Sequence, residues 1–181
     1  GRKLMANLGE LKKGEVYFRA HSLMSTGDGT PAFKWGSTDM YTEDKDGKPV
    51  YNWSVVDRII DTHLKNGVRP YLQLGFMPEA MSTAKPGTPY QHSWRPGFAY
   101  ELIAGGWTAP PKDYAKWEEL AYQWTRHNVE RYGAEEVKRW YFEVWNEPNS
   151  KFYWTGTPEE FYKLHDHAIA GVRRALPEAR V

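Results

Sequence analysis

Short apolar runs alternate along this chain with longer segments of helical spacing, and this alternation limits the folds that the chain can adopt. The strand candidates are rich in aromatic and aliphatic residues and comprise 15–23, 68–76 and the apolar part of 138–149. The helix candidates, in which apolar residues recur at helical intervals, comprise 3–12, 52–67, about 112–132 and the segment that starts at 157. Strands that alternate with helices of this length predict right-handed βαβ units and a parallel sheet.

The ends of the predicted helices carry capping signals. Asn52 is expected to cap the helix that follows it, and Gly67 to end that helix, because glycine adopts a left-handed conformation at little cost. At the last helix, Thr157, Pro158 and Glu160 form the pattern of a capping box with proline in the first turn. These signals fix where the predicted helices begin and end.

Two architectures contain parallel βαβ units. A doubly wound dinucleotide-binding fold would show a G-x-G-x-x-G turn after a strand, and none of the three strand candidates is followed by one. A (β/α)8 barrel has long functional loops at the carboxyl ends of its strands. This chain has a polar loop after the first run, a long loop over about 75–110, and polar residues at the strand ends: His21, Glu79, Asn146 and Glu147.

The barrel therefore fits better, but only part of it is present. A full barrel needs eight strands and about 250 residues. This chain has 181 residues, three strand candidates and, at 179–181, the possible first residues of another. We expect an α/β fold in which residues 1–181 form a single incomplete (β/α)8 catalytic-domain fragment, with strand edges exposed and able to pair with a second copy as a homo-oligomer.

Composition excludes several classes of function. The chain has 24 basic and 23 acidic residues, for a net charge of +1, and this balance predicts no nucleic-acid partner. It has no cysteine, and none of its apolar runs approaches the roughly 20 residues of a membrane helix. The first residues lack the apolar core of a signal peptide, which leaves the compartment open. Aromatic residues make up 15% of the chain, which suits stacking against the apolar faces of sugars.

The segment 138-KRWYFEVWNEPN-149 carries the clearest chemical signal. It places Asn146 and Glu147 at the tip of a predicted barrel strand, where an acid or base can act on a substrate. Nearby aromatic residues can raise the pKa of such a carboxyl group by disfavouring its ionised form, and the Asn146 amide can hold a sugar hydroxyl. The structural alternative is that Asn-Glu-Pro only begins a turn. The preceding apolar strand and Trp145 favour the functional interpretation. The neighbouring aromatic residues are Trp145, Phe152, Tyr153 and Trp154.

Other acids and histidines give weaker signals. Glu143 lies roughly 13 Å from Glu147 along an extended strand, too far for a catalytic pair, and is expected in the barrel core bonded to a basic or amide group. Glu79 is better placed, at a neighbouring strand end. A separation of about 6.5 to 9.5 Å between its carboxyl group and that of Glu147 would suit hydrolysis of a glycosidic bond with inversion. Asp44 and Asp46 resemble part of a calcium loop, but the ligand spacing fails and a turn is expected. No histidine has a partner at metal-site spacing, so we expect neither a metal nor a cofactor.

The segment WYFEVWNEPN resembles the acid/base strand of the family 39 glycoside hydrolases, which include β-xylosidases and α-L-iduronidase. The strings YFRAHSL, GVRPYLQLGFMPEAM and PPKDYAKWEEL resemble the β-xylosidase branch in the same order. The resemblance covers nearly the whole chain except about 24–48 and 82–106. The NEP tripeptide is shared by many retaining glycosidases, whereas the longer strings are more specific.

The resemblance implies a fold, a reaction and roles for three residues. The chain would hold approximately strands two to four and helices one to four of a TIM barrel. Glu147 would be the general acid/base, Asn146 would bind the hydroxyl next to the anomeric carbon, and His21 would line the pocket of the terminal sugar. The mechanism would be retaining, with a nucleophilic Glu on strand seven, outside this chain.

We therefore expect a β-D-xylosidase-like hydrolase that releases terminal xylose from xylo-oligosaccharides, with the isolated 181-residue chain inactive. Two alternatives remain. One is a family 39 enzyme for another sugar, such as a uronic acid or galactose. The other is a sugar-binding fragment without catalysis, which would need no second carboxylate near Glu147.

Overall fold

The computed structural model describes residues 2–11, 14–26, 38–85, 88 and 105–181, and these form an α/β fold. Three strands, β1 (Val16–Ala20), β4 (Val68–Leu74) and β5 (Tyr141–Val144), make a parallel sheet in the order β1-β4-β5. The sequence-predicted parallel sheet is therefore confirmed. At its far edge Arg180 forms a parallel bridge with Tyr141, as expected for the start of a further strand at 179–181.

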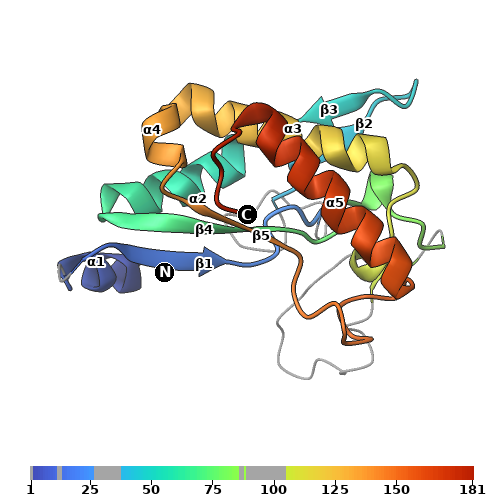
Figure 1. The fold of residues 1–181 in the computed structure, drawn as a ribbon, viewed down its shortest axis with the longest axis horizontal. Coiled ribbons are helices and arrows are strands. Elements are labelled where there is room, and N and C mark those ends of the chain that lie inside the picture. Colours follow the sequence, from blue (N-terminus) through green and yellow to red (C-terminus); the bar gives the residue numbers. More distant parts are fainter. Residues whose placement is uncertain (1, 12–13, 27–37, 86–87, 89–104) are drawn as a thin grey trace.

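Helices connect the strands and cover one face of the sheet, with α2, α3 and α5 on the same side in Figure 1. Among the described residues, none of the helices is both long and apolar enough to cross a membrane. The helices are α1 (Arg2–Glu10), α2 (Ser54–Lys65), α3 (Tyr114–Tyr132), α4 (Ala134–Val137) and α5 (Pro158–Ala175), with short 3-10 turns η1 (Glu79–Met81) and η3 (Gly106–Thr108).

Most predicted helix ends are confirmed, and one cap is wrong. Thr157 and Glu160 form the capping box of α5, with each side chain bonded to the backbone N–H of the other residue. Gly67 follows α2 with a φ of +70°. Asn52, however, lies one residue before the N-cap position, which Trp53 occupies. The Asn52 amide oxygen accepts hydrogen bonds from the Ser54 backbone N–H and hydroxyl, because a turn precedes the helix there.

The segment predicted as a polar loop after β1 contains an antiparallel hairpin. Its strands β2 (Tyr41–Glu43) and β3 (Pro49–Tyr51) are short, and the turn between them is the DKDGK stretch. The Asp44 carboxylate accepts hydrogen bonds from the backbone N–H groups of Asp46 and Lys48, so it is a turn residue, as expected. The other turn signal, GDGTP at 27–31, lies outside the described residues.

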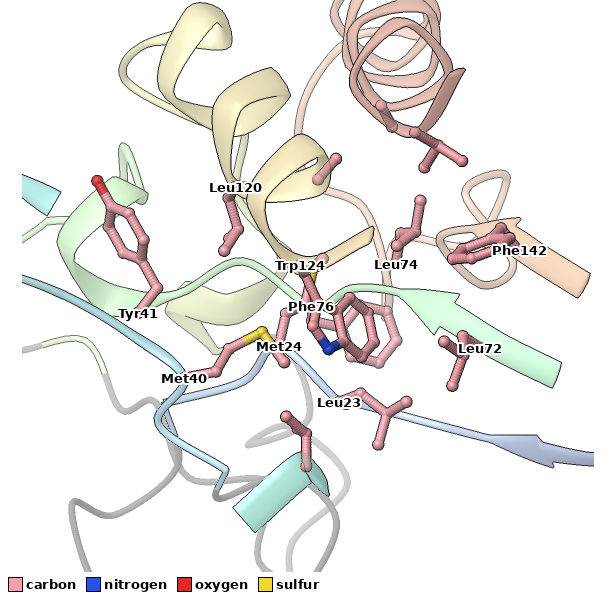
Figure 2. Packing of buried hydrophobic residues seen from close by; sticks show 14 of the residues in the cluster. Leu23, Met24, Met40, Tyr41, Leu72, Leu74, Phe76, Leu120, Trp124 and Phe142 are labelled. Carbon is pink, nitrogen blue, oxygen red and sulfur yellow. The ribbon is translucent and has the colours of Figure 1, made fainter. Parts of the chain in front are cut away.

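The core fills the space between the sheet and its helices. Figure 2 shows Leu72 and Leu74 from β4 and Phe142 from β5 near Leu120 and Trp124 from α3. All five are at most 3% exposed. Their burial fixes which face of the sheet turns toward the helices, because side chains alternate along a strand.

The opposite face of the sheet is polar and aromatic. Tyr17 and Tyr141 meet edge to face with ring centroids 5.0 Å apart, and Tyr71 stacks on Tyr141 at 5.3 Å. Arg19 and Glu143 follow on the same face, and their side chains are 37% and 29% exposed. This face therefore carries the polar groups that lead up to the carboxyl ends of the strands.

Candidate active site at the strand ends

The three parallel strands end at one edge of the sheet, and this edge collects the polar residues predicted as a site. Ala20 pairs with Leu72, and Leu74 pairs with Val144, so the residues just beyond β1, β4 and β5 come together. The buried Gln73 ties two of these ends, because its amide oxygen accepts a 2.7 Å hydrogen bond from the backbone N–H of Ser22. His21, Asn146 and Glu147 all leave the sheet at this edge.

The Asn146 amide joins two strands. Its oxygen accepts a 2.8 Å hydrogen bond from Nη2 of Arg19 and lies 3.0 Å from Nε2 of His21. Asn146 is 9% exposed, so its amide group is largely shielded from water. Two of the three predicted site residues, His21 and Asn146, are therefore in direct contact.

Glu147 follows Asn146 in an uncommon backbone conformation. Its φ is +44° and that of Trp145 is +69°, both in the left-handed region that side chains disfavour. The chain then turns back, with the Ser150 N–H donating to the Glu147 carbonyl at 2.9 Å. Such conformations persist only where the surrounding contacts hold them, which is common at functional sites.

The dry aromatic surround expected for Glu147 is not found in the described structure, where Glu147 is exposed. The aromatic rings instead pack beneath the strand tip. Trp145 is fully buried, donates from Nε1 to the Tyr153 carbonyl at 2.8 Å, and meets Trp154 edge to face at 5.4 Å. The left-handed conformation of Trp145 directs its ring into the core, so these rings support the tip and leave the Glu147 carboxyl group in solvent.

Glu143 has the basic partner that was expected for it. Nε and Nη2 of Arg19 donate to its two carboxylate oxygens at 2.5 and 2.8 Å. This bidentate hydrogen bonding raises the pKa of Arg19 above its usual value. Glu143 is therefore occupied by an ion pair on the strand.

Glu79 stands apart from this network. Its side chain is exposed, and its backbone N–H donates to the Thr26 hydroxyl at 2.9 Å in the turn after β4. Its charge acts on Asp39, whose pKa is raised, mainly by burial and further by Glu79. No contact in the described part of the chain brings Glu79 to Glu147.

A hollow of about 400 Å³ opens directly after Glu147. It lies between the loop that follows β5 and the first turns of α5. Its lining includes three aromatic residues, Trp154, Phe161 and Tyr162, and Asn149 and Lys151 add polar groups. Tyr162 is 63% exposed, which leaves its ring open to a ligand.

The histidines form no metal centre among the residues that the structure describes. His63 is buried in the core, His127 bonds to Asp57 at 2.7 Å, and His167 bonds to Glu118 at 2.8 Å. Each contact joins two helices or a helix and the sheet. These three histidines therefore belong to the packing of the fold.

Among the described residues around Asn146, sequence reasoning missed Arg19. A signal for it was present, because Arg19 and Glu143 lie on the same face of the sheet, on the two strands that flank β4, and a basic partner was expected for Glu143. What the sequence could not show is that the same guanidinium also reaches Asn146.

The chain is similar to known proteins of one family. The family model for glycosyl hydrolases family 39 matches residues 32–181. The chain is 36% identical over 174 residues to a β-xylosidase from Geobacillus stearothermophilus, covering 94% of this chain and 30% of that protein. It is 39% identical over 150 residues to a β-xylosidase from Caldicellulosiruptor saccharolyticus, covering 81% of this chain and 28% of that protein.

The fold agrees as well. The crystal structure of a monomeric β-xylosidase from Caulobacter crescentus CB15 superposes with a TM-score of 0.74 at 30% identity, over 99% of this chain and 31% of that one. The chain thus spans a little under a third of the length of the relatives it matches. The resemblance noted in the sequence is confirmed, and the chain belongs to glycoside hydrolase family 39.

Proposed function

We propose that these residues form the acid/base part of a retaining, β-xylosidase-like glycoside hydrolase. The observation that carries the proposal is the pair at the tip of β5. There Glu147 projects into solvent beside an Asn146 amide that Arg19 and His21 hold in place. The similarity to two β-xylosidases supports xylose as the sugar.

The residues take the following roles. Glu147 protonates the glycosidic oxygen as the bond to the anomeric carbon breaks, and in the second step removes a proton from the attacking water. Asn146 binds the hydroxyl next to the anomeric carbon, and His21 lines the same sugar pocket. The aromatic hollow beyond Glu147 offers ring faces to the departing part of the substrate.

The second carboxylate comes from outside these 181 residues. In a retaining enzyme it lies about 5 Å from the acid/base and forms a covalent bond to the anomeric carbon. Glu143 is held by Arg19, and Glu79 is tied into the turn after β4.

In this proposal the parallel sheet is part of a (β/α)8 barrel, approximately strands two to four with helices one to four, and residues 1–181 form one incomplete catalytic domain. The substrate is a xylo-oligosaccharide or related glycoside.

The test uses the longest natural chain that contains these residues, with Glu147→Gln and, as the matched control, Glu79→Gln. Hydrolysis of xylobiose by Glu147→Gln should fall about 10²- to 10⁴-fold, because its leaving group needs a proton. Cleavage of 2,4-dinitrophenyl β-xyloside to the glycosyl-enzyme should change little. Added azide should yield β-xylosyl azide, because it attacks from the face that Glu147 serves. Glu79→Gln should remain active.

Normal activity of Glu147→Gln on xylobiose would refute the proposal. A glycosyl azide of inverted configuration, together with an inactive Glu79→Gln, would instead support the inverting alternative. Parallel assays with aryl galactosides and uronides test the other sugars. Binding of xylose without turnover of any glycoside by the wild-type chain would favour the sugar-binding alternative.

A further inference from the structure

We infer that Arg19 is a positioning residue that fixes the orientation of the Asn146 amide, so that its NH₂ group faces the sugar. This inference rests on the proposed function and extends it to a residue on a different strand. Arg19 lies on β1 and Asn146 follows β5, and the two strands flank β4 (Figure 1). The contact therefore spans the full width of the three-stranded sheet.

The chemistry of the two groups decides the orientation. A guanidinium carries only donors, so the atom of Asn146 that lies 2.8 Å from Nη2 of Arg19 must be the amide oxygen. The amide nitrogen consequently points away from Arg19. A flipped amide would set two donors against each other, and the buried position of Asn146 offers little water to relieve that clash.

His21 completes the occupation of the amide oxygen. Its Nε2 lies 3.0 Å from the same oxygen, and that oxygen can only accept, so Nε2 carries the hydrogen in this contact. An amide oxygen accepts about two hydrogen bonds, and Arg19 and His21 supply both. Within the part of the chain that the structure describes, the amide NH₂ makes no hydrogen bond. Asn146 is thus arranged to donate to a substrate hydroxyl.

Glu143 fixes the plane of the Arg19 guanidinium so that Nη2 can donate to the Asn146 amide oxygen. It binds Nε and Nη2 of Arg19 together, which fixes both the position and the rotation of the group. Glu143 also neutralises the positive charge close to the site. A lysine at this position has one ammonium group and cannot reproduce the fork while also reaching Asn146.

The experiment compares aryl β-xyloside with aryl 2-deoxy-β-xyloside, which lacks the hydroxyl assigned to Asn146. The ratio of kcat/KM for the two substrates is measured in the wild type, Arg19→Met, Arg19→Lys and Arg19→Met/Glu143→Gln, all in the longest natural chain. The 2-deoxy sugar is intrinsically more reactive, but that term is the same for every variant and cancels when the ratios are compared.

We expect the preference for the 2-hydroxyl to fall about tenfold or more in Arg19→Met, the size of a lost charge-assisted hydrogen bond. Arg19→Lys should recover only part of it. The double variant removes the unpaired carboxylate that Arg19→Met leaves behind. It should recover stability without recovering the preference, because the guanidinium that orients the amide is still absent and His21 supplies only one of the two hydrogen bonds to the amide oxygen.

Two results would overturn the inference. One is an unchanged ratio in Arg19→Met at reduced activity on both substrates, which means that Arg19 is only structural. The other is recovery of the ratio in the double variant, which assigns the loss to unpaired Glu143. Asn146→Ala separates this failure from that of the proposed function. If Asn146→Ala keeps the wild-type ratio, Asn146 does not bind the hydroxyl, and the assignment of the site itself fails.

Discussion

The imidazole ring of His63 lies edge-on to the phenyl ring of Phe18, with ring centroids 5.3 Å apart. His63 is on α2, is 2% exposed, and its Nδ1 has no hydrogen-bond partner in the described structure. Burial lowers its pKa to about 4, since the charged form cannot be solvated there. The folded state therefore needs neutral His63.

This depressed pKa predicts acid destabilisation in a defined window. Above the unfolded pKa of about 6.5 both states hold neutral His63, and its full contribution is present. As the pH falls from about 6.5 to about 4, only the unfolded state takes up the proton. The free energy of unfolding should fall by about 3 kcal/mol, and the contribution of His63 should then stay constant.

Urea unfolding at several pH values checks this, with His63→Leu as the comparison. The leucine fills a similar volume and does not titrate. The difference in unfolding free energy between wild type and variant should change across that window. A difference that stays constant from pH 7 to pH 4 would show that His63 is not held neutral by the fold.

The capping box of α5 predicts different losses of stability for two substitutions of Thr157. The Thr157 hydroxyl accepts from the Glu160 N–H at 3.2 Å, and the Glu160 carboxylate accepts from the Thr157 N–H at 2.7 Å. Thr157→Ala should lower the unfolding free energy by about 1 kcal/mol, and Thr157→Ser should cost much less, because it keeps the hydroxyl. Equal losses in urea unfolding would mean that the hydroxyl does not cap the helix.

At Gly171 of α5 we expect alanine to be less stable than glycine, against the usual order of helix propensities. A Cβ built at this position of α5 would lie 2.3 Å from the Glu118 carbonyl oxygen of α3, so the two helices would have to move apart. We expect Gly171→Ala to destabilise by about 1–3 kcal/mol, although alanine favours helices. The neighbouring exposed Ala170 is the control.

Ala170→Gly should cost about 1 kcal/mol through propensity alone. Opposite substitutions at adjacent positions of one helix would then both destabilise in thermal or urea unfolding. If Gly171→Ala instead stabilised the chain, the close contact between α3 and α5 would not exist as described.

Trp145 packs in the core and directly precedes Asn146, so a change at this position should affect both stability and activity. Trp145→Phe removes the hydrogen bond from Nε1 to the Tyr153 carbonyl, at a cost of about 1 kcal/mol. Because Trp145 directly precedes Asn146, we also expect a drop in kcat/KM. Trp53→Phe is the control, since Trp53 stacks on Tyr51 and His127 away from the strand ends. It should affect stability and leave kcat/KM near the wild-type value.

The parts of the fold that the sequence predicted well are those governed by local rules. Short runs rich in aromatic and aliphatic residues located the three parallel strands, and the Thr157–Glu160 pattern located the start of α5 to the residue. The hairpin of β2 and β3 was missed because its strands have only three residues each, too few for a period to be visible. Asn52 was misplaced by one residue because asparagine favours both caps and turns.

The site was predictable only as a set of residue types. Chain order placed His21, Asn146 and Glu147 at strand ends, and the structure brings the first two into contact. The position of Arg19 in that contact depends on the register between β1, β4 and β5, which is a property of the folded sheet. The exposure of Glu147 likewise depends on where the backbone turns, and no local pattern in the sequence specifies that turn.

The left-handed residues on either side of Asn146 restrict which sequences can occupy this tip. At such φ values glycine, asparagine and aspartate are favoured, and a bulky side chain costs about 1 kcal/mol or more. A library randomised at the exposed position 147 and selected for folding alone should therefore drift toward glycine and asparagine, whereas the buried ring of Trp145 is retained for its packing. Glutamate at position 147 does not stabilise this backbone conformation. Only a selection that depends on its carboxyl group would therefore retain it.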